Sequence, residues 1–241
     1  MLTGPVIEIF DREKFLAAIN EAVEIEPGKT AVLTIEMTDR RLPESAPFPA
    51  GVRDSLLSST EDLLSMARDS GIAVIHVLSA LRVVEANARA ATKFDSGWAA
   101  IGESVSPYGP LPDESVQGQD GTFKPDLAVS VTDSDFIIKT KKSLSAFYQT
   151  DLDWLLKALG ADTVILAGSS TNADILSTAF EASCRGMKVI TVAECVASTY
   201  GQDLHEVGLQ QLGRCQGWVL GMDELAKKLP VSALAAQGGA A

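Results

Sequence analysis

The sequence predicts a doubly wound, Rossmann-like α/β fold, in which a mostly parallel six-stranded sheet carries helices on both faces. Short apolar runs alternate with stretches of helical periodicity along most of the 241 residues. The runs are almost continuously apolar, which is typical of strands covered on both faces. Strand followed by helix at this spacing is typical of right-handed βαβ units.

Six β-rich runs are the predicted strands, and small or polar residues close each of them. They span residues 30–35, 73–78, 136–138, 163–167, 188–192 and 218–220. Helical stripes lie between them. Leu152, Leu155, Leu156 and Leu159 repeat on one helix face, and Gly160 is a suitable C-terminal stop. Similar stripes span residues 56–67, 175–182 and 204–212.

The pattern predicts one domain over residues 1–229, with its core at about 28–222, followed by a flexible tail at 230–241. Two segments interrupt the rhythm: a proline-rich loop at 42–49 and a long polar insert at 82–133. A long irregular insert in a compact domain is usually functional or flexible.

Composition excludes several classes of protein. The net charge of -12 argues against nucleic-acid binding, which needs a basic surface. No apolar run reaches the roughly 18 residues of a membrane span, and the N-terminus lacks the pattern of a signal peptide. Three cysteines fit no metal or redox spacing. We therefore expect a soluble, cytoplasmic protein that acts on a small molecule.

Ligands of doubly wound sheets bind beyond the carboxyl ends of the strands. The segments predicted to lie there are 36–41, 79–85, 139–147 and 168–174. Glu36 ends an apolar strand, where burial would raise its pKa and make it a general acid; the alternative is a solvated acid that opens a loop. The cluster of Lys139, Lys141 and Lys142 is either a solvated basic patch or the source of one lysine that points into the crevice.

The segment 168–174, GSSTNAD, links a strand to a helix. Its small residues allow backbone N–H groups to face a ligand, so Ser169, Ser170 and Ala173 are candidates for an oxyanion or carboxylate site. Asp174 falls in the first helical turn, where the helix dipole favours its ionised form. The alternative is that Asp174 only stabilises that turn.

The remaining signals are weak or negative. Arg82, with Glu85, is a candidate contact for a charged substrate group, although such loop residues are usually solvated. His205 and Glu206 are not followed by the second histidine of a zinc-protease motif. His76 lies inside a strand and is interpreted as a packed core residue. We therefore predict no metal site and no cofactor.

Four blocks of the chain resemble the isochorismatase-like hydrolases, a family that includes nicotinamidases, N-carbamoylsarcosine amidohydrolases and isochorismatases. They are residues 31–37 (AVLTIEM), 141–147 (KKSLSAF), 168–179 (GSSTNADILSTA) and 205–212 (HEVGLQQL), and the resemblance extends over about 28–222. It implies a catalytic aspartate, lysine and cysteine at the positions that Glu36, Lys141 and Asp174 occupy here. It also implies a cis peptide between Ser169 and Ser170 and a homo-oligomer, a dimer or tetramer.

A carboxylate at the nucleophile position puts thiol-covalent amidase chemistry in doubt. Some isochorismatases similarly lack the cysteine and use the strand-end acid as a proton donor. We therefore expect a hydrolase in which a protonated Glu36 donates a proton, Lys141 orients it and an ionised Asp174 binds or activates water. The alternatives are a covalent acyl-aspartate route, which is disfavoured because carboxylates are weak acyl acceptors, and a non-catalytic member of the family that binds a small molecule. The sequence does not identify the substrate.

Overall fold

The fold is built on one six-stranded parallel sheet. The computed structural model describes residues 13–44, 48–90, 116–122, 124 and 126–230. The strands are β1 (Thr30–Ile35), β2 (Ala73–Ser79), β5 (Phe136–Lys141), β6 (Thr163–Ser169), β7 (Lys188–Ala197) and β8 (Trp218–Leu220). They lie in the order β5-β2-β1-β6-β7-β8, and every pair is parallel. This is the strand order of the Rossmann fold, so its switch point lies between β1 and β6.

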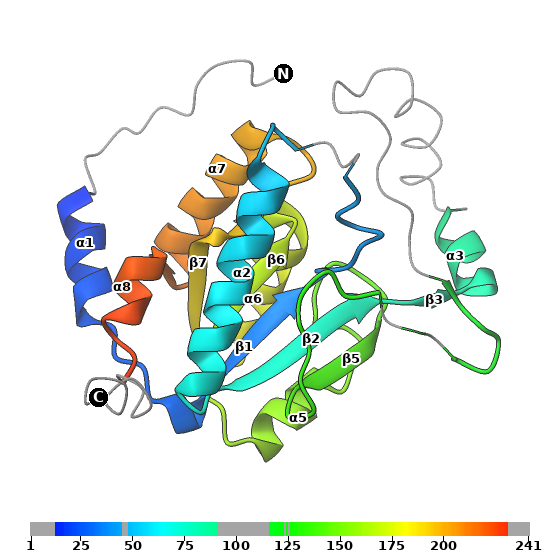
Figure 1. Ribbon diagram of the computed structural model, residues 1–241, viewed down its shortest axis with the longest axis horizontal. Helices are drawn as coiled ribbons and strands as arrows, with labels where there is room; N and C mark the ends of the chain where they lie inside the picture. Colours follow the sequence, from blue (N-terminus) through cyan, green and yellow to red (C-terminus); the bar gives the residue numbers. More distant parts are fainter. Residues whose placement is uncertain (1–12, 45–47, 91–115, 123, 125, 231–241) are drawn as a thin grey trace, which may run out of the picture.

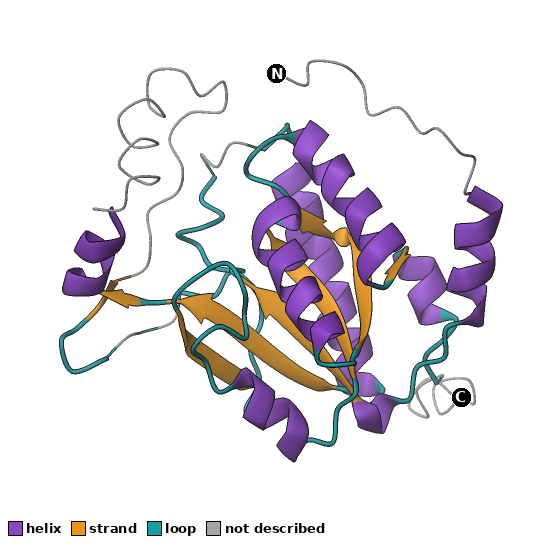
Figure 2. Cartoon of the chain, turned by 180° about the vertical axis from the view of Figure 1, so that it is seen from behind, coloured by secondary structure: helices purple, strands orange, loops and turns teal. Residues whose placement is uncertain are grey.

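Helices cover both faces of the sheet, as the sequence predicts. The helices of the main body are α1 (Glu13–Ala22), α2 (Val52–Asp69), α5 (Leu152–Ala158), α6 (Leu176–Cys184), α7 (Gln202–Gln211) and α8 (Met222–Ala226). Shorter turns are η1 (Pro27–Lys29), η2 (Thr171–Ile175) and η3 (Leu212–Gln216). In Figure 1, α2 crosses the front of the sheet, and Figure 2 presents the molecule from behind.

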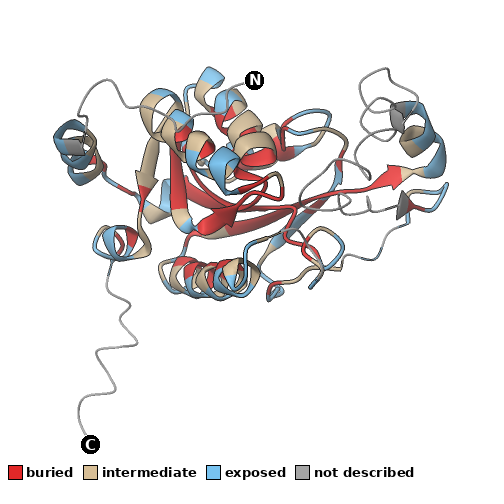
Figure 3. Cartoon of the chain, turned by 90° about the horizontal axis from the view of Figure 1, so that it is seen from above, coloured by how far each residue is buried: buried red, intermediate tan, exposed pale blue. Residues whose placement is uncertain are grey.

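Successive strand residues contribute to two separate cores, one on each face. Val32 packs in the core that contains Leu63 and Leu64 of α2. The next residue, Leu33, packs in the other core, which contains Leu152 and Leu156 of α5. Seen from above, the buried residues form a layer through the sheet and the inner sides of the helices (Figure 3). The alternation of strand side chains explains why these strands read as continuous apolar runs.

A buried polar network ties α2 to the sheet and confirms the interpretation of His76 as a core residue. His76 Nδ1 lies 2.7 Å from the Thr34 hydroxyl, and its Nε2 lies 3.4 Å from Asp135. Arg68 of α2 donates to the same carboxylate at 2.7 Å. Burial raises the pKa of Asp135, but hydrogen bonds from Arg68 and Thr132 outweigh it and hold the pKa at about 2.

Three features differ from the sequence prediction or extend it. Strand β5 continues to Lys141, so this lysine lies in the strand and not in the loop after it. Helix α1 was not predicted; its Asn20 donates to the Val219 carbonyl of β8 at 2.8 Å. The insert contains β3 (Leu81–Arg82), α3 (Val83–Ala90) and β4 (Val116–Gln117), and β3 pairs with β4 in an arm at the right of Figure 1.

Some predictions fall on residues outside the described ranges. These are most of the flexible tail predicted at 230–241, the part of the insert at 91–115 and residues 45–47 of the proline-rich loop. Among the described helices, none has the length and apolar character needed to cross a membrane.

Candidate active site

Three charged side chains from distant parts of the chain meet at the carboxyl edge of the sheet. Glu36 follows β1, Lys141 ends β5 and Asp174 lies in η2 after β6. The Lys141 ammonium donates to Glu36 Oε1 at 2.8 Å and to Asp174 Oδ1 at 2.5 Å. All three side chains are almost fully buried, with exposed fractions of 2%, 1% and 6% in chain order. The structure thus brings together the three residues that the sequence predicts to converge, beside the switch point of the sheet.

Glu36 is held by its backbone and by both carboxylate oxygens. Its φ of 56° lies in the left-handed region, which is uncommon for a residue other than glycine and is often found at functional sites. Its amide donates to the Val77 carbonyl at 2.9 Å. The Ser79 hydroxyl makes a short hydrogen bond to Oε1, and Arg41 Nε lies 3.5 Å from Oε2.

Gly168 allows β6 to run close to β1 just before the site. Its φ is 125°, and a Cβ atom at this position would lie 2.0 Å from the Ile35 carbonyl oxygen. Only glycine fits such an approach. Because Ile35 and Gly168 are paired in register, the approach places the residues that follow each strand side by side.

The turn that carries Asp174 is bonded internally. The peptide between Ser169 and Ser170 is cis, as the family resemblance implies. The Ser170 amide lies 3.4 Å from Asp174 Oδ2, and the Ala173 amide donates to the Ser170 carbonyl at 3.1 Å. The hydroxyls of Ser169 and Ser170 lie 3.2 Å apart. An oxyanion-binding role for these residues stays a prediction, and in this structure the Ala173 N–H is engaged within the turn.

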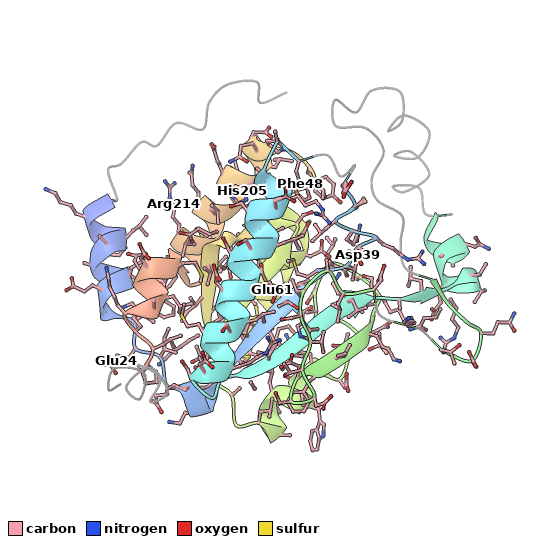
Figure 4. The ribbon with its side chains drawn as sticks, in the orientation of Figure 1. Glu24, Asp39, Phe48, Glu61, His205 and Arg214 are labelled. Atoms are coloured by element: carbon pink, nitrogen blue, oxygen red, sulfur yellow. The ribbon has the colours of Figure 1, made fainter. Side chains whose placement is uncertain are left out.

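The same turn is held from outside by α7 and the loop before it. Thr171 Oγ1 lies 2.8 Å from His205 Nδ1, and the Ser198 hydroxyl donates to Asn172 Oδ1 at 2.6 Å. Figure 4 labels His205 on α7, near the end of the molecule where α2 begins. The site therefore depends on α7 as well as on the three strands.

The charges around Glu36 correct the expectation that it is protonated in the resting protein. Burial raises its pKa, but the charges of Lys141 and Arg41, together with hydrogen bonds from Lys141 and Ser79, outweigh burial and hold the pKa below its ordinary value. Burial likewise lowers the pKa of Lys141, and the carboxylates of Glu36 and Asp174 outweigh it and raise the pKa above its ordinary value. The resting site therefore contains a Glu36 carboxylate and a Lys141 ammonium.

Arg41 and Ser79 are the site residues that the sequence analysis missed. Both belong to segments that the sequence predicts to lie beyond the carboxyl ends of strands: Arg41 to 36–41 and Ser79 to 79–85. Sequence periodicity assigns a segment to the sheet edge but does not tell which of its side chains turns inward. Asp39, in the same loop as Arg41, is labelled in Figure 4 near the ends of β1 and β2.

Arg82 lies elsewhere, in the arm. Its Nη1 donates to Glu85 Oε1 at 3.1 Å and its Nε to the Gln119 carbonyl at 3.2 Å. Lys142 joins this group by donating to Glu85 at 2.9 Å. Among its hydrogen bonds to described residues, Arg82 makes none to Glu36, Lys141 or Asp174. Its predicted contact with a charged substrate group therefore stays a prediction. Within the described ranges, no cluster of three or more His, Cys, Asp and Glu is arranged to hold a metal ion.

A buried charged cluster at the switch point of a doubly wound sheet defines a Rossmann-like α/β protein with an enzyme-like site. A sequence model of the isochorismatase domain matches residues 30–224. The chain belongs to the isochorismatase family. Its relatives that are named for an activity, a maleamate amidohydrolase and a nicotinamidase, are hydrolases.

Relatives and solved structures agree with this assignment. The chain is 29% identical to a maleamate amidohydrolase of Pseudomonas putida over 202 residues, which cover 83% of this chain and 87% of that protein. It is 37% identical to the uncharacterised isochorismatase family protein YwoC of Bacillus subtilis over 106 residues, 42% of this chain and 55% of YwoC. A crystal structure of an isochorismatase-like hydrolase from Alkaliphilus metalliredigens superposes with a TM-score of 0.60 at 27% identity, covering 83% of this chain and 98% of that one.

Proposed function

We propose that this protein hydrolyses a small organic substrate through acid–base chemistry of Glu36, Lys141 and Asp174, without a covalent thiol intermediate. The observation that supports this most is the single Lys141 ammonium bonded to two buried carboxylates, at 2.8 and 2.5 Å. Because the Lys141 ammonium contacts both carboxylates, one carboxylate can take up a proton while the other releases one.

In this mechanism Asp174 accepts a proton from water, and the resulting hydroxide adds to the electrophilic carbon of the substrate. Glu36 delivers a proton to the leaving group as its bond to that carbon breaks. Lys141 contacts both carboxylates, so it passes its proton to Glu36 and regains one from Asp174. One water is consumed, and each residue returns to its starting charge.

The substrate class follows from the relatives and not from the geometry. Because one relative is named a maleamate amidohydrolase, small amides that carry a carboxylate, maleamate first, are the substrates to test. Simple amides without such a group, including nicotinamide, are expected to turn over slowly, because the site lacks the cysteine nucleophile that the family resemblance implies. We also expect a cytoplasmic homo-oligomer, a dimer or tetramer, whose mass light scattering would measure.

The experiment is a hydrolysis screen of small amides, esters and vinyl ethers with the purified protein. Any substrate found is then tested with Glu36→Gln, which preserves the shape of the side chain and removes its proton. Turnover should fall by at least about a hundredfold, the usual scale for a positioned acid or base, while binding persists. If the parent binds a compound, hydrolyses none, and the variants bind it equally well, the protein is a non-catalytic binder.

A further inference from the structure

Arg41 differs from the other three charged groups of the site in its access to solvent. Its side chain is 21% exposed, whereas those of Glu36, Lys141 and Asp174 are between 1% and 6% exposed. Among the four, Arg41 is therefore the charged side chain that a ligand in solvent can contact without entering the buried part of the site.

The two oxygens of Glu36 have different partners. Oε1 accepts from Lys141 at 2.8 Å and from the Ser79 hydroxyl, both of which are buried. Oε2 forms the ion pair with Arg41, over 3.5 Å. The Arg41 contact is thus the longest and most exposed of the three. Its loss would leave the contacts that hold Glu36 in the site intact.

The loop fixes the backbone on both sides of Arg41, so its side chain can change partner without moving the loop. The Arg41 amide lies 3.2 Å from the Thr38 hydroxyl, and the Leu42 amide donates to the Thr38 carbonyl at 2.9 Å. Leu42 is fully buried, and its carbonyl accepts from Arg53 of α2 at 2.6 Å.

We propose that Arg41 is a specificity-determining residue that binds a carboxylate of the substrate, and that Glu36 occupies the place of that carboxylate while the site is empty. A guanidinium presents five donors in a fork that matches a carboxylate in bidentate geometry. A substrate carboxylate that binds this fork displaces Glu36 Oε2, which lies 3.5 Å from Arg41 Nε.

The exchange also prepares the proton donor of the proposed hydrolysis, and to that extent it rests on the proposed function. Among the residues that the structure describes, the charged groups that face Glu36 are Lys141, Arg41 and, beyond Lys141, Asp174. Burial raises the pKa of Glu36, and Lys141 and Arg41 together lower it. When the substrate neutralises Arg41, one of the two positive charges that lower the pKa of Glu36 is offset, while Lys141 and the Ser79 hydroxyl remain, and Glu36 takes up a proton more readily. Binding of the substrate carboxylate to Arg41 thereby favours the protonated Glu36 that the substrate needs as its proton donor.

The first test is binding, which needs no turnover. Succinate and maleate are the probes, because neither contains a bond to hydrolyse, and 1,4-butanediol is the uncharged control of the same chain length. Calorimetry should find both dicarboxylates bound to the parent and butanediol not. Arg41→Met should weaken dicarboxylate binding by about tenfold to a hundredfold, and Arg41→Lys should recover only part of it, since a lysine lacks the fork. Arg40→Met, which removes a neighbouring, half-exposed arginine paired with Asp126, is the matched control and should bind like the parent.

The second test follows the Glu36 carboxyl by ¹³C NMR in protein labelled at glutamate, with Glu36→Gln to assign the signal. Saturating succinate should move the titration of Glu36 to higher pH in the parent, and Arg41→Met should move it in the same direction without ligand. The proposal is wrong if neither dicarboxylate binds more tightly than butanediol, if Arg41→Met binds them like the parent, or if succinate leaves the Glu36 titration unchanged. Positive results here combined with no hydrolysis of any substrate would reject the proposed function alone.

Discussion

At the scale of single residues, the carboxylate at position 174 changes the partners of the site lysine. Lys141 donates to Asp174 at 2.5 Å and to Glu36 at 2.8 Å, so it bridges two acids. The family resemblance places a cysteine at this position. A thiol there would be a nucleophile, whereas we propose that Asp174 accepts a proton from water.

Two substitutions at position 174 separate these chemistries. Asp174→Asn preserves the shape and removes the base, so turnover should fall by at least about a hundredfold with the substrate that the hydrolysis screen identifies. Asp174→Cys should restore a nucleophile of the family type and raise hydrolysis of simple amides above that of the parent. Steady-state kinetics measures both. Unchanged turnover in Asp174→Asn would remove Asp174 from the proposed mechanism.

The buried charges also predict how stability depends on pH. Glu36 has a pKa held below 4.5, so its stabilising contribution is present above that pH and is lost as the pH falls through the lowered value. Lys141 has a pKa held above 10.5, so its contribution is present below that pH and is lost as the pH rises through the raised value. Urea unfolding of the parent should therefore give a plateau with an acid and an alkaline limb.

Glu36→Gln should lower this plateau and flatten the acid limb, because the variant has no carboxylate to protonate there. The matched control is Glu24→Gln, at an exposed position labelled in Figure 4. If Glu24→Gln flattens the acid limb as much as Glu36→Gln does, the limb belongs to the surface and not to the site.

At the scale of elements, α7 sets the position of the turn that carries Asp174. A Cβ atom on Gly208 would lie 3.1 Å from Thr171 Cγ2 and 3.2 Å from Asn172 Cα and N. Such contacts are tight, and the nearest atoms include backbone, so the turn and not a flexible side chain would have to move. The absence of a side chain at Gly208 is therefore part of how Asp174 reaches Lys141.

Gly208→Ala should lower kcat by about tenfold and destabilise the fold by about 1–3 kcal/mol, because it moves the turn that carries Asp174 and overpacks the contact with α7. Kinetics and urea unfolding measure the two effects. Gly213→Ala is the control, since its Cβ would meet only the Val219 side chain, at 3.3 Å. Equal loss of kcat in the two variants would mean that the Gly208 contact has no particular connection to the site.

At the scale of the whole molecule, the thiols lie apart from the site. Cys184 and Cys215 are exposed, and Cys195 is buried in the core beneath α2. Burial raises the pKa of the Cys195 thiol to about 12. Because the alkylating species is the thiolate, Cys195 should be protected in the folded protein.

Iodoacetamide should therefore modify two of the three cysteines of the native protein, and mass spectrometry should assign them as Cys184 and Cys215. Hydrolytic activity should remain, because no thiol belongs to the proposed mechanism. Cys195 should react only after unfolding. Loss of activity on modification of Cys184, with the fold intact, would overturn the assignment of the site.

The sequence by itself determined which runs become strands and which polar residues follow each strand along the chain. The runs at 30–35 and 163–167 form β1 and β6. Their positions predict that Glu36 and Asp174, which follow them, lie at the carboxyl edge of the sheet. Such predictions are possible because strand and helix periodicity is encoded by residues that are close in sequence. The extent of β5 was underestimated, because an edge strand with exposed Phe136 and Ile137 lacks the continuous apolar signal.

Only the tertiary structure decided the charge state of the site. Burial at a strand end predicted a protonated Glu36, but Lys141, 105 residues away along the chain, and Arg41, which turns back from its loop, reverse that outcome. The pKa of a buried acid depends on every charge that folding brings within a few ångströms, and no local pattern records those distances.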